Sequence, residues 1–186
     1  MKALILSGMP AAGKTATAQE ISKKTGVSMA GGGDVLKEMA RERGYSVTDE
    51  DWWDTPDGIK FLRERELNPD FDKEADRRMI EKIERGNIVV TSYTMPWLSE
   101  RGVKVWLEAS KDTRTKRMAL RDSIPIDRAR EIVSVRDREN YELYKKMYGI
   151  ELGVDMKPFN IIIDVNNKTQ EQVAEEILKE AGDKPE

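Results

Sequence analysis

Short runs of apolar residues alternate along the chain with longer stretches in which apolar residues recur every three or four positions. The runs are short enough to be strands, and their continuous apolar character is typical of parallel strands that are buried on both faces. We predict five strands, at residues 3–6, 27–30, 88–90, 103–107 and 159–163.

The longer stretches have the spacing of helices that place one apolar face against a core. Val35, Leu36 and Met39 form such a face after Asp34, a residue type that often caps a helix. We predict helices at residues 16–26, 34–44, 72–85 and 127–148, and a last helix from residue 169, where a capping box begins.

This alternation predicts an α/β protein, in which right-handed crossovers join a parallel sheet with helices on both faces. The chain of 186 residues is long enough for one such domain, and we expect residues 1–186 to form it. Residues 34–86 are too many for one crossover helix, so we expect a helical insertion there. Ligands of open parallel sheets bind at the carboxyl ends of the strands.

The first predicted strand is followed by residues 8–15, which read GMPAAGKT and match the phosphate-binding loop pattern GxxxxGK[ST]. A glycine-rich turn that binds nothing is the alternative, but strand, loop and helix stand in the order that the motif requires. We therefore predict an ATP site that is formed by Gly8, Met9, Pro10, Ala11, Ala12, Gly13, Lys14, Thr15 and Ala16. In this site Lys14 would reach the β- and γ-phosphates, and Thr15 would offer its hydroxyl to Mg²⁺.

Residues 112–138 are rich in arginine and form a second insertion. Cationic side chains that arrive when a lid closes stabilise the charge of a phosphoryl group in transfer and exclude water. We expect three arginines to have this role: Arg117, Arg121 and Arg136. Three others are expected to lie on a solvated helix face: Arg114, Arg128 and Arg130.

Composition excludes several classes of protein. The formal net charge of −3 argues against a general surface for nucleic acid or membrane. The chain has no cysteine and no histidine, which excludes disulfides, thiolate metal sites and the usual general base. No apolar run approaches the length of a membrane span, so we expect a cytoplasmic enzyme whose partners are small molecules.

Three stretches of the chain, residues 33–40, 68–76 and 144–150, resemble the archaeal cytidylate kinases. With the phosphate-binding loop, the resemblance spans nearly the whole chain. It implies a P-loop kinase fold with strand order 2-3-1-4-5 and phosphoryl transfer from ATP, with Mg²⁺, to CMP. On this basis we expect the acceptor, the molecule that receives the phosphate, to contact Gly33, Asp34, Lys37, Asp72, Arg78 and Tyr93.

Four positions depart from the pattern of that family, and all lie on the acceptor side or on the closing face. Gly31 stands in place of a serine, Lys37 and Leu143 each replace an arginine, and residues 91–93 read TSY in place of Glu-Gly-Arg. An arginine binds an acceptor phosphate through a planar fork, which tyrosine and leucine cannot reproduce. The departures leave the donor side intact and weaken the expectation that CMP is the acceptor.

Three functions therefore stay open. The first is a nucleoside monophosphate kinase for CMP. The second is a kinase for a phosphorylated alcohol such as mevalonate 3-phosphate, in which Asp34 would act as the general base rather than only as a helix cap. The third is a nucleotide-binding protein without turnover, against which the intact Lys14 and Thr15 argue.

Residues 45–68 are polar and mixed, and no helix is predicted there. Trp52 and Trp53 stand out in this stretch. They could line an acceptor pocket, although two adjacent tryptophans more often anchor a helix to the core.

Overall fold

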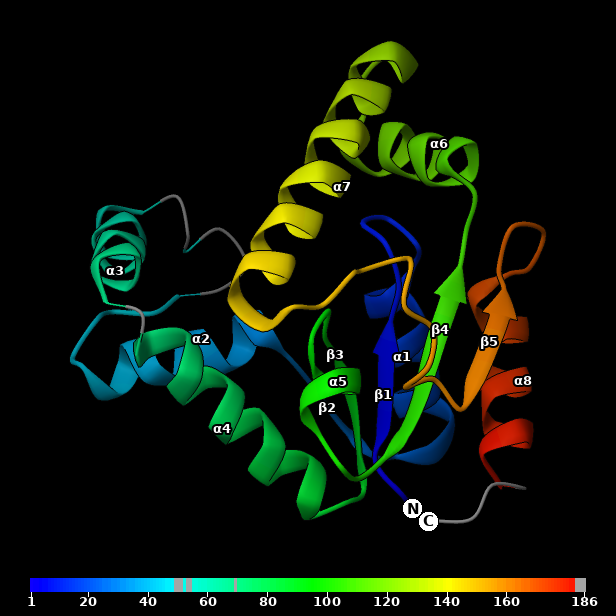
Figure 1. Ribbon diagram of the computed structural model, residues 1–186, viewed down its shortest axis with the longest axis horizontal. Coiled ribbons are helices and arrows are strands. Elements are labelled where there is room, and N and C mark those ends of the chain that lie inside the picture. The colour runs from blue at the N-terminus through cyan, green and yellow to red at the C-terminus, as the bar shows by residue number, and fades with distance from the viewer. Residues whose placement is uncertain (49–51, 53–54, 69, 183–186) are drawn as a thin grey trace.

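A computed structural model of the chain describes residues 1–48, 52, 55–68 and 70–182 (Figure 1). Its strands form one parallel sheet with the order β2-β3-β1-β4-β5. This confirms the α/β class and the strand order that the family resemblance implies. The strands are β1 (Leu4–Ser7), β2 (Ser28–Gly31), β3 (Ile88–Thr91), β4 (Val103–Glu108) and β5 (Ile161–Asp164).

The central strand β1 shows why a continuous apolar run suits this position. Its side chains alternate between the two faces, so that Leu4 and Leu6 join the core on one side while Ile5 joins the core on the other. All three are at most 1% exposed. Strand β1 lies between β3 and β4. The connection after β1 leads to β2 on one side of it, whereas the connection after β3 leads to β4 on the other side. Open α/β sheets bind their ligands where such connections diverge.

Helices cover both faces of the sheet and extend beyond its carboxyl edge (Figure 1). One core lies between the sheet and α1 and α8, and the other lies under α2, α4 and α5. Two further helices, α6 and α7, stand over the carboxyl ends of the strands (Figure 1). The helices are α1 (Lys14–Thr25), α2 (Gly32–Glu42), α3 (Pro56–Leu67), α4 (Asp70–Glu84), α5 (Met95–Leu98), α6 (Lys111–Asp122), α7 (Ile126–Tyr148) and α8 (Gln170–Gly182).

Helix α2 begins two residues earlier than predicted, which changes the role of Asp34. Gly31 is the residue before the helix, and its backbone N–H donates to the Asp34 carboxylate at 2.7 Å. Asp34 therefore lies in the first turn and bonds back to the chain, instead of preceding the helix as predicted. An acidic side chain in this turn also interacts favourably with the positive end of the helix.

Helix α3 lies in the stretch for which no helix was predicted. Thr55 caps it by accepting the backbone N–H of Gly58 at 3.2 Å, and Pro56 occupies its first position. Its fully buried Phe61 packs against the rings of Tyr45, Trp52 and Phe71, with centroids 5.5–5.7 Å apart. Trp52 is thus a core residue that packs against α3, while Trp53 lies outside the described residues.

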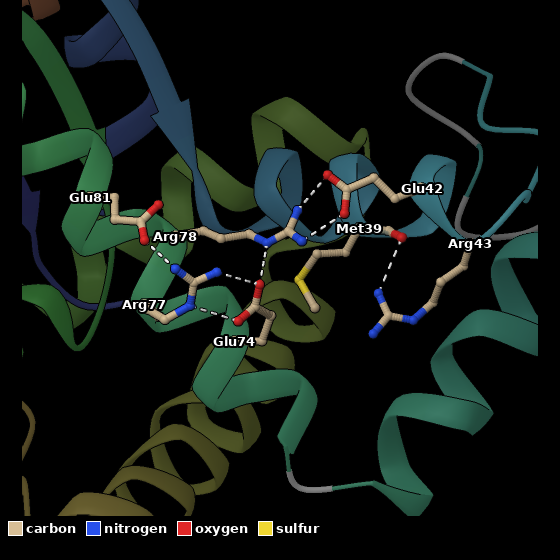
Figure 2. A network of polar contacts seen from close by, with 7 residues as sticks. All are labelled: Met39, Glu42, Arg43, Glu74, Arg77, Arg78 and Glu81. Carbon is tan, nitrogen blue, oxygen red and sulfur yellow. Dashed lines mark hydrogen bonds and ion pairs between the residues drawn. The ribbon is translucent and has the colours of Figure 1, made fainter.

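The α2–α4 contact is held by a network of ion pairs on its surface. In Figure 2 the Arg78 guanidinium of α4 lies between Glu42 of α2 and Glu74 of its own helix, at 2.6 and 2.7 Å. Arg77 extends the network from Glu74 to Glu81. Hydrogen bonds from Arg77 and then Arg78 lower the pKa of Glu74 to about 2. The network fixes α2 against α4 and leaves Arg78 engaged by carboxylates.

A buried arginine ties α6 and α7 to the phosphate-binding loop. Arg114 is only 5% exposed and donates to both carboxylate oxygens of Asp137, at 2.7 and 2.8 Å. It also donates to the carbonyl of Pro10 in the loop, at 3.2 Å. The expectation of a solvated Arg114 is therefore wrong, because the sequence pattern does not show that this face of α6 meets the partly buried Asp137 carboxylate of α7. For Arg128 and Arg130, which form exposed ion pairs, it is confirmed.

Within the residues that the structure describes, no helix is both long enough and apolar enough to cross a membrane.

We expect Arg114→Leu to lower the free energy of unfolding by about 3 kcal/mol, since it leaves the Asp137 carboxylate without its buried partner. Urea denaturation measures this loss through the transition midpoint. Arg128→Leu is the matched control, because its exposed pair with Glu131 contributes only about 0.5 kcal/mol. Equal midpoints for the two variants would show that Arg114 does not hold the lid to the loop.

Candidate active site

The phosphate-binding loop connects the end of β1 to the first turn of α1. Gly8 and Gly13 have φ values of +153° and +103°, in the region that favours glycine. A Cβ atom on Gly8 would lie only 2.8 Å from the backbone oxygen of Leu107, so the loop packs directly against β4. The unpaired N–H groups of the first turn of α1 lie at the end of this loop, which makes it a site for a polyphosphate.

Lys14 lies at the centre of the site, and its ammonium group is hydrogen-bonded to the loop itself. Its ammonium donates to the carbonyls of Gly8 and Met9, at 2.7 and 3.1 Å, and lies 4.3 Å from the centre of the Tyr93 ring. Burial and, to a smaller extent, the Arg114 guanidinium lower the pKa of Lys14 to about 7, and Asp137 opposes both. The side chain must therefore exchange loop carbonyls for phosphate oxygens when a nucleotide binds.

The donor cavity lies between the loop, α6 and α7 and has a volume of about 580 Å³. All three predicted lid arginines line it: Arg117, Arg121 and Arg136. Arg117 also donates to the carbonyls of Ala12 and Val165, at 2.9 and 2.5 Å. Arg121 pairs with Asp122 at 2.6 Å. The structure thus brings the predicted cations to the loop, and it gives Arg117 a second task in supporting the loop backbone.

The acceptor cavity, of about 510 Å³, lies on the other side of Lys14, between the ends of β2 and β3 and helices α4 and α7. Four of the predicted acceptor residues line it: Gly33, Asp34, Asp72 and Tyr93. Lys37 and Arg78 do not line it. Arg78 belongs to the network of Figure 2, so its expected contact with the acceptor is not supported by its position.

Sequence reasoning missed several side chains of the acceptor cavity. Arg65 of α3 bonds to Asp72, with Nε and Nη2 at 2.9 and 2.7 Å from the same oxygen. Tyr148 of α7 donates to Asp76 at 2.5 Å. Burial raises the pKa of Asp76, and the bond from Tyr148 partly opposes this. The spacing of Asp72 and Asp76, four residues apart on one helix, could have indicated that both face the cavity.

The end of β2 shows how one of the family departures is accommodated. Gly31 and Thr91 are register partners in neighbouring strands. A Cβ atom on Gly31 would lie 2.9 Å from the Thr91 hydroxyl and 3.5 Å from the Asp34 carboxylate. The Thr91 hydroxyl therefore occupies the space that a serine at position 31 would need.

The residues at the loop fit a magnesium ion that is bound together with a nucleotide. Thr15 is exposed and lines both cavities, where its hydroxyl can serve as an oxygen ligand. Among residues 1–48, 52, 55–68 and 70–182, no group of three or more acidic side chains could hold a metal. Mg²⁺ commonly takes one or two protein oxygens, with phosphates and waters completing its octahedron.

Comparisons with known proteins show the family and the fold that this chain shares. The model of a family described as "AAA domain" matches residues 4–141. A cytidylate kinase from Pyrobaculum aerophilum is 31% identical over 169 residues, which cover 90% of this chain and 85% of that protein. One from Pyrococcus horikoshii is 28% identical, with 91% and 83% covered. A structure of shikimate kinase from Acinetobacter baumannii has a TM-score of 0.55 at 17% identity, covering 96% and 92%, and shares the fold.

We expect nucleotide binding at pH 8.5 to take up about one proton, which Lys14 acquires. In the free protein the pKa of this group is lowered from 10.5 to about 7, whereas phosphate oxygens favour its charged form. Affinity should therefore fall as the pH rises above about 7. Calorimetry of Mg·ADP binding in buffers with different ionisation enthalpies measures the uptake. The proton uptake should vanish in Lys14→Met. It should persist in Lys23→Met, which replaces an exposed lysine of the same helix.

We expect Gly31→Ser to destabilise the protein by about 1 kcal/mol through overpacking against the Thr91 hydroxyl. The double variant Gly31→Ser/Thr91→Ala should recover most of this loss in thermal unfolding. Gly32→Ser is the matched control, because a Cβ atom there meets nothing within 4 Å. Equal losses in the single and double variants would mean that the two positions are not coupled.

Proposed function

Since the chain belongs to the AAA domain family and to the family of the archaeal cytidylate kinases, and is an ATP-dependent P-loop kinase, we propose that it transfers the γ-phosphate of ATP to CMP. The acceptor cavity meets the donor cavity at Lys14 and Thr15. A phosphate oxygen of CMP, already anionic, attacks the γ-phosphorus without a general base. The bond to the β–γ bridging oxygen breaks, and ADP and CDP leave.

The Arg65–Asp72 pair is the observation that carries the choice of CMP. Cytosine presents two acceptors, O2 and N3, beside the N4 amino donor. An arginine offers two donors and a carboxylate offers an acceptor, so the pair on the cavity wall complements this edge. Uracil has a donor at N3 and an acceptor at O4, which would leave both side chains mismatched.

The donor side supplies the electrostatic part of catalysis. Lys14 moves from the loop carbonyls to the phosphates, and Arg121 and Arg136 face the same cavity. Fixed cations stabilise the charge that develops on the equatorial oxygens of the moving group. Thr15 would hold Mg²⁺, which would neutralise part of the negative charge of the phosphates.

A phosphorylated alcohol such as mevalonate 3-phosphate is the second candidate, and one observation favours it. The described residues that line the acceptor cavity include three carboxylates, Asp34, Asp72 and Asp76, and two cations, Lys14 and Arg65. Arg65 is already paired, so an acceptor phosphate finds few cations there. With an alcohol, Asp34 would accept the hydroxyl proton as a general base.

The deciding experiment offers ATP and Mg²⁺ with CMP, dCMP, UMP, AMP or mevalonate 3-phosphate and follows the release of ADP. We expect CMP to be preferred over UMP, and Asp72→Asn to reduce this preference by about ten-fold, as for the loss of one base contact. Asp70→Asn, an exposed residue of the same helix, is the matched control and should keep the preference. Turnover only with the alcohol, abolished in Asp34→Asn, would reject CMP as the acceptor.

A further inference from the structure

Tyr93 lies where the donor and acceptor cavities meet. Among the described residues, only Lys14, Thr15 and Tyr93 line both cavities. Lys14 and Thr15 belong to the loop, so Tyr93 is the one side chain at this junction that comes from elsewhere, directly after β3. Tyr93 therefore lies between the two cavities.

The Tyr93 ring connects the loop to helix α7. The Lys14 ammonium lies 4.3 Å from its centre, at the distance of a cation–π contact. The ring of Tyr144 lies 5.6 Å away, with 32° between the two planes. Aromatic pairs at this separation attract one another, and tyrosine gives up little conformational freedom when it is packed. The loop, the segment after β3 and helix α7 thus meet at the junction through the stacked side chains of Lys14, Tyr93 and Tyr144.

Helix α7 spans both cavities. Arg136 faces the donor cavity, and Tyr144 and Tyr148 face the acceptor cavity two and three turns further along. Burial raises the pKa of Tyr93, and the nearby Arg136 opposes this shift. Burial also raises the pKa of Tyr144. Both rings are therefore neutral at physiological pH and carry no charge that would attract water to the junction.

A kinase that binds ATP before its acceptor must keep water from the γ-phosphate. If water attacks, its oxygen bonds to the γ-phosphorus, the bond to the β–γ bridging oxygen breaks, and ADP, phosphate and a proton leave. Active sites suppress this reaction by excluding water from the reacting group. In this protein the acceptor cavity gives water one route to the junction, and this route ends at Tyr93.

We propose that Tyr93 and Tyr144 form an aromatic partition that shields the γ-phosphate from water while the acceptor cavity is empty. Both act as positioning residues, and the acceptor separates the two rings when it enters. The inference rests on the kinase activity but not on CMP, since its main test contains no acceptor.

The test measures ADP release from ATP and Mg²⁺ without acceptor, and then phosphoryl transfer with CMP. We expect Tyr93→Ala and Tyr144→Ala each to raise hydrolysis by about ten-fold and to lower the ratio of transfer to hydrolysis. Tyr93→Phe keeps the ring and should restore low hydrolysis. The double alanine variant should hydrolyse ATP no faster than either single variant, because the rings act as one barrier.

Tyr141→Ala is the matched control, since Tyr141 lies on the same helix and its hydroxyl bonds only to Lys145 and Glu151 among the described residues. Its hydrolysis rate should equal that of the unaltered protein. Thermal unfolding with Mg·ADP verifies that each variant is folded. Parallel losses of hydrolysis and transfer, or unchanged hydrolysis in both alanine variants, would overturn the partition. Raised hydrolysis without any CMP transfer would support the partition and would reject only the choice of CMP as the acceptor.

Discussion

The buried guanidinium of Arg114 is the contact on which the active site depends. It joins α6 to Asp137 of α7 and to the Pro10 carbonyl of the phosphate-binding loop. Removing one partner of such a buried pair is costly, so the lid helices and the loop form one unit. Its charge also acts on Lys14, whose pKa it lowers in addition to burial. The contact that holds the lid helices to the loop thus also disfavours the charged form of Lys14, and a bound phosphate would stabilise that form.

The two cavities divide the chemistry by charge. Arginines line the donor cavity, whereas carboxylates and tyrosines are prominent in the acceptor cavity. A triphosphate suits the first, and a polar ring or a hydroxylated carbon chain suits the second. Lys14 stands at the border, where the group in transfer has the largest negative charge. Any acceptor must therefore bring its reactive oxygen to this border while its remaining atoms face Asp72, Asp76 and Arg65.

The features that were predicted correctly from the sequence are those that local backbone constraints determine. The loop was predictable because Gly8 and Gly13 adopt backbone conformations that few other residues allow. The strand order came from the family resemblance, since periodicity does not specify which strands pair. Helix α3 was missed because its buried Phe61 packs in an aromatic cluster without a regular period. Arg78 lies six residues after Asp72, about 240° around the helix, so the two cannot share a face.

Positions that depart from the family pattern lie next to residues that accommodate them. Thr91 fills the space that Gly31 leaves, and Tyr93 pairs with Tyr144, the residue beside the substituted Leu143. An arginine at position 93 would bring a hydrated charge to the junction, whereas a tyrosine brings a neutral ring that packs on another. In the proposed partition, a tyrosine in place of the arginine that the family resemblance implies would both remove a phosphate ligand and add a water barrier.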